Sequence, residues 1–444
     1  MELDLNELKK VEELILRFFC ESHDFNGIPL RQISQDLALE YEYSIELVKE
    51  LVRTEVASIQ SSSNPHIIGF SHHSVDSQLQ VLEDAKNTIV ETQTYGMLEM
   101  SIEQTDYPIC VYPAREFVRE NRDVSIFSNA KYTIQLALAE PQLSFRFFET
   151  DVLERYSNDP RFDFEFQDFS GSISSQYDEN GNPILREEDQ IFLKSFGLGF
   201  DTNSTRLVAV LLCDLSKLSW EHQVYWSTKE IPHTECKVLA DYYNNVIHGQ
   251  WITAKSIFTA LIDEINAIHK LTSSIFGTPL FRKELDGEHR PKNFTFFFSP
   301  TSKNYYDFIN LLDKFISENI NKSFFEGTLE LEELKKIEGD IYERVRKGTL
   351  RLLEEWIELS FRFNDDTIPS KMLRPLKKVR KERQTPAHKV VDNEYDKTFV
   401  TKQKNIMEEC YLSITSLRKN LQTHPKAQHV ELDPYMDRME VKYF

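Results

Sequence analysis

The chain has 444 residues, of which 40% are hydrophobic and 28% charged, and its formal net charge is −20 at pH 7. This composition is ordinary for a soluble globular protein, and the length allows two or three domains. The acidic balance argues against a protein that coats DNA or binds anionic membranes non-specifically. The sequence has neither an apolar run of about 18 residues nor a signal-peptide pattern at its N-terminus. We therefore expect a cytoplasmic protein without membrane association.

Five cysteines are scattered along the chain, at Cys20, Cys110, Cys213, Cys236 and Cys410. The sequence has no Cys-x-x-Cys pair, the spacing typical of structural zinc sites and redox motifs. The motifs of nucleotide-phosphate loops, of serine hydrolases with a nucleophile elbow and of zinc peptidases are also missing from the sequence. We therefore expect reduced thiols, no metal and no cofactor.

The first predicted domain covers residues 1–72. Its apolar residues recur at helical spacing in three segments, and a short apolar strand follows, at 8–19, 30–40, 44–56 and 66–70. Ser44 is expected to cap the third helix. Three helices followed by a strand resemble a winged helix, so we expect a winged-helix-like N-terminal module.

Two roles are open for the third helix of this module. In winged-helix proteins the corresponding helix enters a DNA groove. Here it carries Glu46, Glu50 and Glu55 beside Lys49 and Arg53, so it presents no basic face. The charges therefore favour protein contact or dimerisation over DNA binding.

The second predicted region, 73–245, mixes helices and strands. Helical patterns cover 75–89 and 130–140. Strand patterns are found at 109–114, 162–169 and 206–215, and two further segments form the arms of a hairpin, 172–177 and 184–193. We expect an α+β region.

An aromatic cluster follows in the same region, at Trp220, Tyr225 and Trp226. Such side chains can stack on nucleic-acid bases. Aromatic clusters are more often part of a core or an interface, and both interpretations remain open.

The third predicted region, 246–444, reads as a helical bundle. Helical patterns occupy four segments, the third of them broken near Gly348, at 256–271, 305–320, 331–361 and 398–421. A short strand is expected at 293–298, and the last twenty or so residues are expected to form a loose polar tail. Arg418 and His424 are expected to provide a basic cap at the end of the last helix.

The most basic stretch of the chain is 371–389, KMLRPLKKVRKERQTPAHK. It contains eight Lys and Arg residues and one acid, a surplus of about +7, and leaves 44 Lys and Arg against 71 acids elsewhere. A positive island in a negative protein is typical of a phosphate-binding site, because the remaining surface repels polyanions.

The spacing within this stretch singles out Arg383. Pro375 fits the first turn of a helix. Leu376, Val379 and Arg383 then fall on one helical face, so Arg383 occupies a position where a buried apolar side chain is expected. An inward-facing arginine needs an anionic or hydrogen-bonding partner. Pro386 disfavours a helix at the residue before it and predicts a bend ahead of His388.

The string Arg383-Gln384-Thr385-Pro386-Ala387-His388 resembles the R-x4-6-H signature of HEPN domains. In that family a polar residue, often asparagine, follows the arginine, and here Gln384 occupies the position. The sequence contains four Arg/His pairs at this spacing, at Arg17/His23, Arg282/His289, Arg383/His388 and Arg418/His424. Arg383/His388 combines an amide after the arginine with a basic helix before it. The resemblance implies a HEPN-like helical domain over about 300–424.

Many HEPN domains are metal-independent ribonucleases of toxin, antiviral-defence or RNA-processing systems, and they commonly form homodimers. The resemblance thus implies a hydrolase that cleaves RNA through its 2′-hydroxyl. His388 is then the general acid or base, Arg383 holds the phosphate, and Gln384 bonds a phosphate oxygen or orients His388. Four further cations are expected to guide the RNA backbone, Lys377, Lys378, Arg380 and Lys381.

The whole sequence therefore predicts a multidomain, predominantly helical α+β protein, with RNA as the expected partner. A second interpretation remains open. In it the chain is a non-catalytic regulatory protein whose N-terminal module binds a protein partner. The C-terminal bundle is then structural, and Arg383 makes an ordinary ion pair.

Overall fold

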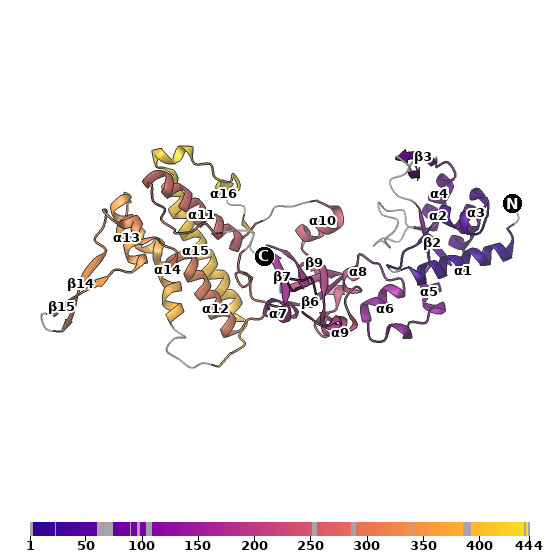
Figure 1. The fold of residues 1–444 in the computed structure, drawn as a ribbon, viewed down its shortest axis with the longest axis horizontal. Helices are drawn as coiled ribbons and strands as arrows, with labels where there is room; N and C mark the ends of the chain where they lie inside the picture. Colours follow the sequence, from indigo (N-terminus) through magenta and orange to yellow (C-terminus); the bar gives the residue numbers. More distant parts are fainter. Residues whose placement is uncertain are drawn as a thin grey trace. The chain divides into compact units, whose positions relative to one another are not determined.

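The structure is a computed structural model. It describes residues 3–22, 24–59, 74–88, 90–95, 98–103, 109–250, 255–285, 290–338, 341–384, 392–438 and 441–442. Helices form the larger share of these residues and strands the smaller, so the predicted α+β class is confirmed (Figure 1).

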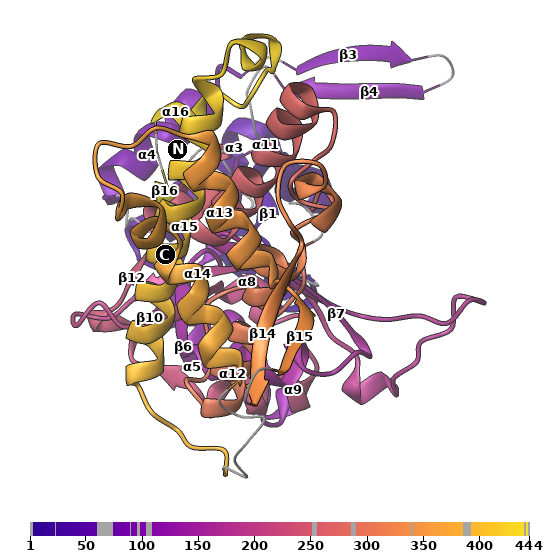
Figure 2. The ribbon, with the colours of Figure 1, turned by 90° about the vertical axis from the view of Figure 1, so that its left-hand side faces the viewer.

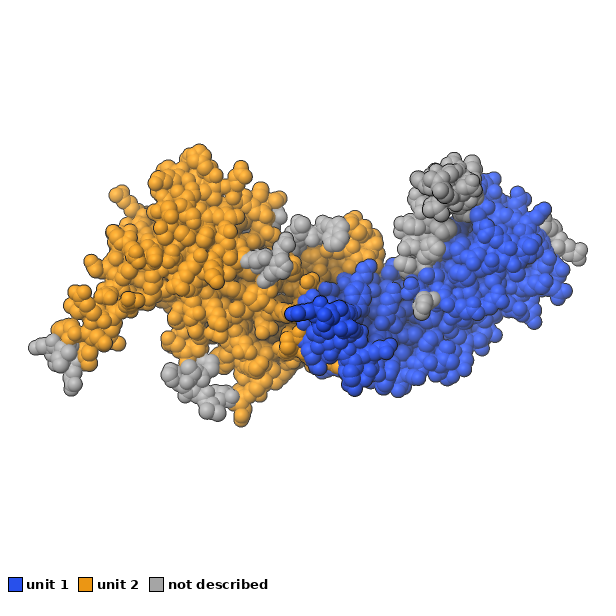
Figure 3. Space-filling model, in the orientation of Figure 1, with its two compact units in different colours: residues 1–149, 161–163, 172–239 blue, residues 150–160, 164–171, 240–444 orange. Residues whose placement is uncertain are grey.

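The chain divides into two compact units (Figure 3). Unit 1 comprises 1–149, 161–163 and 172–239. Unit 2 comprises 150–160, 164–171 and 240–444.

Unit 1 begins with helices and a small antiparallel sheet. The elements are α1 (Leu5–Glu21), β1 (Ile28–Pro29), α2 (Leu30–Asp36), α3 (Tyr41–Arg53), β2 (Ala57–Ile59) and, later in the chain, β5 (Cys110–Pro113). The strand order is β1-β5-β2, and both pairings are antiparallel. Between β2 and β5 lie α4 (Val75–Ala85) and the hairpin of β3 (Val90–Tyr95) and β4 (Leu98–Glu103). Apolar side chains of the three first helices and of the sheet form one core, which includes Val11, Ile15, Ile33, Val48, Leu51 and Val111.

The helices predicted at 8–19, 30–40, 44–56 and 75–89 are present with shifted ends. Ser44 does not cap the third helix. The helix begins at Tyr41, and Ser44 is buried inside it, where its Oγ donates a hydrogen bond of 3.1 Å to the carbonyl of Glu40. The predicted strand at 66–70 lies outside the described residues.

A seven-stranded sheet follows. Its strands are β6 (Phe145–Glu149), β7 (Phe162–Gln167), β8 (Ser170–Ser175), β9 (Phe192–Phe200), β10 (Arg206–Leu211), β11 (Glu230–Ile231) and β12 (Lys237–Val238). The order is β11-β6-β10-β9-β8-β7, and β12 also pairs with β9. The helices of this part are α5 (Arg115–Asn121), α6 (Lys131–Ala137), α7 (Glu154–Ser157), α8 (Leu212–Leu215) and α9 (Trp220–Ser227).

The alternation predicted for 162–169 is confirmed, because Phe162, Phe164 and Phe166 are buried and the residues between them are exposed. The strand predicted at 206–215 ends at Leu211, where the chain turns into α8. The second arm of the predicted hairpin begins at Phe192 rather than at 184, since a turn and a short 3₁₀ helix occupy the residues before it.

Unit 2 is built mainly from helices. From residue 240 onward they are α10 (Ala240–His248), α11 (Ile257–Phe276), α12 (Ser302–Asp313), its π-helical continuation η5 (Lys314–Glu318), α13 (Thr349–Ser360), α14 (Ile368–Gln384), α15 (Thr398–Gln422) and α16 (Tyr435–Arg438). The apolar stripes of α11 and α15 are buried, as the spacing predicts, through Leu261, Ile265, Ile268, Ile406, Ile414 and Leu417. Inside this unit the fully buried Arg418 of α15 pairs with Glu264 of α11 at 2.5 Å.

Arg418 is therefore not the C-terminal cap that the sequence predicts. Its side chain has no exposed surface, and it points to the carboxylate of Glu264. His424 instead begins the 3₁₀ helix η8 (Pro425–His429), where its ring accepts a hydrogen bond from the backbone N–H of Lys426.

The helix predicted over 331–361 is wrong for its first half. The strands β14 (Glu332–Glu338) and β15 (Ile341–Arg346) pair in antiparallel fashion, and within the predicted range only α13 is helical among the described residues (Figure 2). Leu334 and Ile337 belong to the predicted apolar stripe, yet they are 67% and 62% exposed. The stripe thus has no core surface to cover, and the backbone groups pair across the hairpin instead.

Two other predictions for this unit also fail. Residues 293–298 form no strand. Phe296, Phe297 and Phe298 are all buried, so burial does not alternate as it does along a half-buried strand, and the rings pack against other aromatic side chains, as Phe294 does with Phe315 at 4.6 Å. The C-terminal residues are not a loose tail. They form η8, α16 and β16 (Val441–Lys442), which pairs in parallel with β13 (Lys255–Ser256).

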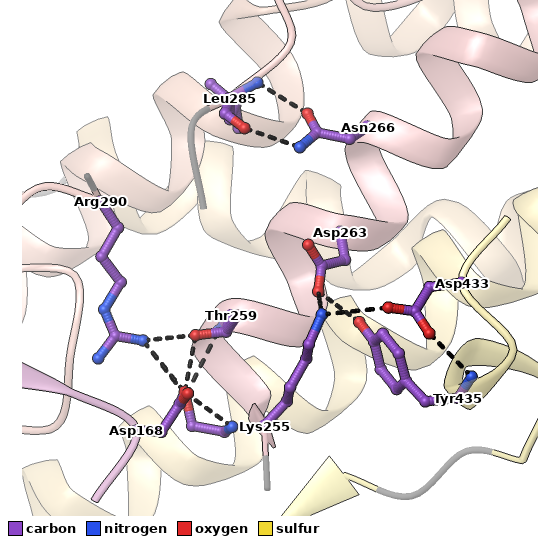
Figure 4. A network of polar contacts seen from close by, with 10 residues as sticks. Asp168, Lys255, Thr259, Asp263, Asn266, Leu285, Arg290, Asp433 and Tyr435 are labelled. Atoms are coloured by element: carbon purple, nitrogen blue, oxygen red, sulfur yellow. Dashed lines mark hydrogen bonds and ion pairs between the residues drawn. The ribbon is translucent and has the colours of Figure 1, made fainter. Parts of the chain in front are cut away.

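A polar network fixes the start of α11 within unit 2 (Figure 4). Asp168 accepts hydrogen bonds from the N–H of Ser256 at 2.9 Å and the hydroxyl of Thr259 at 2.7 Å. The buried Arg290 donates to the same hydroxyl at 2.9 Å and lies 3.7 Å from Asp168. These groups satisfy one another, so we assign the network a structural role.

The same figure shows how the C-terminal residues join α11. Lys255 lies 2.8 Å from Asp263 and 3.7 Å from Asp433. The hydroxyl of Tyr435 donates to Asp263. These contacts hold Asp433 and Tyr435 against β13 and α11, which explains why this segment is not a loose tail.

Candidate functional site

Helix α14 carries the basic residues that the sequence singles out. It begins at Ile368, so Pro375 lies inside the helix rather than in its first turn. A proline at this position has no backbone N–H, so it cannot donate the intrahelical hydrogen bond to the carbonyl four residues before it. Leu373, Leu376 and Val379 are buried, and this apolar face sets the direction in which the cations point.

Arg383 lies at the end of this face and has the anionic partners that its position predicts. Its Nη1 is 2.6 Å from Oδ2 of Asp313, on α12, and also donates to Oε1 of Glu318, on η5. The side chain of Asp313 has no exposed surface, whereas that of Arg383 is 30% exposed. The hydrogen bonds with Asp313 and then Glu318 raise the pKa of Arg383 above its ordinary value, so the guanidinium is permanently charged.

Asp313 holds a second arginine at the same time. Nε of Arg380 is 3.1 Å from Oδ1 of Asp313, and its Nη2 donates to the hydroxyl of Ser317 at 2.7 Å. Ser317 in turn donates to Asp313. The π-helical turn η5 places Ser317 and Glu318 so that both face α14. Two guanidiniums thus share two carboxylates, and the formal charge of the cluster is zero.

Within the described part of the chain, one edge of the Arg383 guanidinium has no hydrogen-bond partner. Among the described residues, both hydrogen bonds of this side chain are made by Nη1. The edge formed by Nε and Nη2 carries two parallel N–H groups, the fork that binds carboxylates and phosphates in a bidentate manner. Asp313 and Glu318 therefore fix the orientation of the guanidinium and leave this fork available.

Two lysines of α14 form ion pairs with acids. Nζ of Lys377 is 2.6 Å from Glu354, and Nζ of Lys378 is 3.4 Å from Glu409. Lys381 is exposed. The surplus of positive charge counted along 371–389 is therefore reduced by acids from α13 and α15, which are distant in sequence.

The remaining residues of the predicted site are only partly described. Gln384 is the last residue of α14, and its side chain is exposed. His388 and the bend at Pro386 lie outside the described residues. The predicted convergence of Arg383 and His388 stays a prediction.

A pocket on the neighbouring face of α14 was not predicted from the sequence. It encloses about 330 Å³ and is lined by Tyr305, Tyr306, Lys378, Glu382, Phe399, Lys402 and Asn405. The residues come from α12, α14 and α15, which are up to about a hundred positions apart. The adjacent Tyr305-Tyr306 pair is a weak signal, and no local spacing connects it with the other walls.

The aromatic cluster of unit 1 is partly core. Trp226 is fully buried and packs edge-on against Phe148, with ring centroids 4.9 Å apart. Trp220 is 52% exposed. Trp226 therefore has a packing role and is not accessible for stacking on a base.

The cations of α3 are paired with acids. Lys49 lies 2.5 Å from Glu83 and 3.1 Å from Glu46, and Arg53 lies 3.1 Å from Glu50. Lys86 adds a pair with Glu46 at 2.7 Å. These pairs give α3 no surplus of positive charge for a DNA backbone.

Within the described ranges, no group of three or more His, Cys, Asp or Glu side chains is placed to hold a metal ion. No helix of that part of the chain is long and apolar enough to cross a membrane. Comparison of the chain with protein-family models, with curated proteins and with solved structures finds no match.

Proposed function

We propose that the chain is a metal-independent endoribonuclease of HEPN type, with Arg383, Gln384 and His388 as its catalytic residues. One observation carries the proposal. Arg383 is anchored through Nη1, and its Nε–Nη2 fork is open among the described residues. A guanidinium held by carboxylates is preorganised, so it loses little side-chain entropy when it binds a phosphate.

The chemistry needs few groups, because RNA supplies its own nucleophile. His388, with an ordinary pKa of about 6.5, takes a proton from the 2′-hydroxyl or gives one to the leaving oxygen. Arg383 binds the phosphate and stabilises the charge that develops on its oxygens. Gln384 bonds a phosphate oxygen or orients His388. Lys377, Lys378, Arg380 and Lys381 attract the backbone without reading its sequence.

The same proposal includes assembly and biology. A homodimer through the C-terminal helices brings two Arg/His pairs together, and a toxin or antiviral-defence role in the cytoplasm fits such an activity. Light scattering tests the homodimer. The homodimer is contradicted if the protein is a monomer at micromolar concentration and still has full RNA-cleaving activity.

A second candidate function is a non-catalytic regulatory protein. It is favoured by the ion pairs of α14, since Lys377, Lys378, Arg380 and Arg383 each have a carboxylate partner. In this case the helical region is structural. The N-terminal part, with its β1-β5-β2 sheet beside three helices, is then a winged-helix-like module that binds a protein partner.

Cleavage of labelled RNA in EDTA separates the two candidates. The endoribonuclease cleaves RNA and spares DNA of the same sequence, since DNA lacks the 2′-hydroxyl. Arg383→Ala is expected to remove cleavage. Arg374→Ala is the matched control, because Arg374 is an exposed arginine on the same helix. Equal cleavage by both variants overturns the assignment of Arg383, and absence of RNA cleavage by the parent protein supports the regulatory role.

A further inference from the structure

The pocket beside the basic helix has walls of three kinds. Tyr305 and Phe399 stack at 5.0 Å with 29° between their planes, and both are largely buried. Tyr306 meets Tyr305 at 5.6 Å and is only partly buried, so its ring faces the pocket and solvent. The pocket thus combines a buried aromatic floor with one accessible ring, an arrangement that suits a flat heteroaromatic ligand.

Cations stand at the pocket wall. Nζ of Lys402 lies 4.6 Å from the centre of the Phe399 ring, which holds the ammonium beside the aromatic floor. Lys378 is 45% exposed, and its partner Glu409 is 43% exposed. An exposed pair of this kind is worth little, so Lys378 can exchange the carboxylate for a phosphate. The pocket is therefore built for a ligand with both a ring and an anionic group.

Glu382 supplies the acceptor. The hydroxyl of Tyr305 donates to its Oε2. Burial raises the pKa of Tyr305, with a further contribution from Glu382, so the tyrosine stays protonated and remains a donor. No other hydrogen bond to Glu382 is found among the described residues. Its carboxylate is held in position and keeps lone pairs for additional donors.

A carboxylate distinguishes the four RNA bases by their donors. Guanine presents two adjacent N–H donors, N1–H and N2–H, on its Watson–Crick edge. Adenine and cytosine place an acceptor beside the amino group, and uracil has a single N–H between two carbonyl groups. A bidentate contact with Glu382 is thus available to guanine alone, and Asn405 adds an amide at the pocket wall.

We infer that this pocket binds a guanine base of single-stranded RNA. The base stacks on Tyr306, its Watson–Crick edge donates to Glu382, and Lys378 and Lys402 bind the adjoining phosphate. Glu382 and Arg383 are consecutive on α14, so the base pocket and the phosphate fork belong to one segment of the same helix. The inference rests on the proposed function for its choice of RNA over a free nucleotide, and it adds base selection to that function.

The test measures binding rather than cleavage. Short uridine-rich RNAs that contain one guanosine, one adenosine or neither are titrated into the His388→Ala protein, with GMP, AMP, CMP and UMP as separate ligands. We expect the guanosine-containing RNA to bind roughly ten-fold tighter than the other two, since the bidentate base contact is available to guanosine alone. GMP is expected to bind better than the other nucleotides and more weakly than the RNA.

Substitutions then identify the residues. Glu382→Gln is expected to remove the guanosine preference, because an amide can accept through one atom only. Glu358→Gln, at an exposed acid on α13, is the matched control and should retain the preference. Tyr306→Ala should weaken binding of all the RNAs by about ten-fold, because stacking does not depend on the base. Thermal unfolding of each variant confirms that the fold is retained.

Two results overturn the assignment of a guanine site. One is equal affinity of all the RNAs for the protein with an unaltered pocket, and the other is a guanosine preference that is retained in Glu382→Gln. If GMP binds as tightly as the RNA, the pocket is assigned to a free nucleotide, and the proposal that it binds a base of single-stranded RNA is wrong. A guanosine preference without any RNA cleavage by the parent protein supports the pocket while the endoribonuclease proposal fails.

Discussion

The Nη1 atom of Arg383 lies 2.6 Å from Oδ2 of Asp313, a carboxylate with no exposed surface. The other oxygen of the same carboxylate accepts from Nε of Arg380 at 3.1 Å. A buried carboxylate is costly unless charged or hydrogen-bonding partners surround it, and here two arginines and Ser317 do so. The end of α14 is thus fixed to the end of α12 by one acid.

Asp313→Asn tests this anchoring. The amide keeps the shape but loses the charge that both guanidiniums face, and hydrogen bonds to charged groups are worth about 1.5–3 kcal/mol. We expect the free energy of unfolding to fall by roughly this amount in urea denaturation. Asp307→Asn on the same helix is the control, because that side chain is 58% exposed and should change stability little. Equal stability of the two variants would show that the anchoring contributes nothing.

The buried pair of Arg418 and Glu264 gives a second stability prediction. Both side chains have at most 1% exposure, and the pair joins α15 to α11 at 2.5 Å. Burial raises the pKa of Glu264, and the hydrogen bond with Arg418 opposes that shift. Arg418→Met removes the partner and should cost about 3–5 kcal/mol, since it leaves a carboxyl group buried and unpaired.

A double replacement provides the control for this pair. Arg418→Met combined with Glu264→Leu removes both charges from the core. It should recover most of the stability lost in the single variant, because an apolar pair needs no compensation. Chemical denaturation of the parent, the two single variants and the double variant completes the thermodynamic cycle. A double variant no more stable than Arg418→Met contradicts the explanation.

The sequence predicts the features of the fold that depend on local periodicity. The apolar stripe of α14 places Leu376 and Val379 in the core, and the alternation of β7 buries Phe164. It also predicts that Arg383 needs an anionic partner. It does not identify Asp313, which is 70 positions away, because the two residues meet only through the packing of α12 against α14.

The predictions that were wrong also failed because tertiary contacts decide the structure at those positions. Leu334 and Ile337 recur at helical spacing, yet no core surface lies beside them, so the chain forms a hairpin there. Arg418 has the sequence context of a helix cap and is instead paired in the core with Glu264, which is 154 positions away. The acids beside Lys377 and Lys378 could not be predicted either, since they belong to α13 and α15.

Glu83 gives a prediction on pH. Its hydrogen bonds with Lys49 and then Lys86 lower the pKa of Glu83 to about 2. A carboxyl group whose pKa is lower in the folded state stabilises the fold above its unfolded pKa, and this stabilisation is lost as the pH falls towards about 2. The side chain is 48% exposed, so salt should weaken the effect.

The measurement compares the parent with Glu83→Gln between neutral and acid pH. The parent should have the higher melting temperature at neutral pH, and the difference should disappear as Glu83 is protonated. An NMR titration of the Glu83 carboxyl group reports its pKa directly. A pKa near the ordinary value of about 4.3 would show that the two lysines do not hold the charge.

The thiols give a prediction on chemical reactivity. Cys410 is fully buried, and burial raises its pKa far above the ordinary value. Burial also raises the pKa of Cys213 to about 12. Since the thiolate is the reactive form, both residues should resist iodoacetamide at mildly alkaline pH, whereas Cys20 and Cys236, whose pKa values burial raises less, should react before them. Mass spectrometry of the labelled peptides, with urea-unfolded protein as the control, checks the order.

The catalytic proposal makes the last prediction. His388→Ala should reduce RNA cleavage by roughly 10²–10⁴-fold, the usual contribution of general acid–base catalysis. RNA affinity should change little, because the imidazole transfers a proton and the phosphate is held by Arg383. Replacing Lys377 and Lys378 by Ala should have the opposite effect, with weaker binding and a shallower dependence on salt. His424→Ala is the matched control, since that histidine lies at the start of η8. Cleavage at the parental rate by His388→Ala would remove His388 from the site.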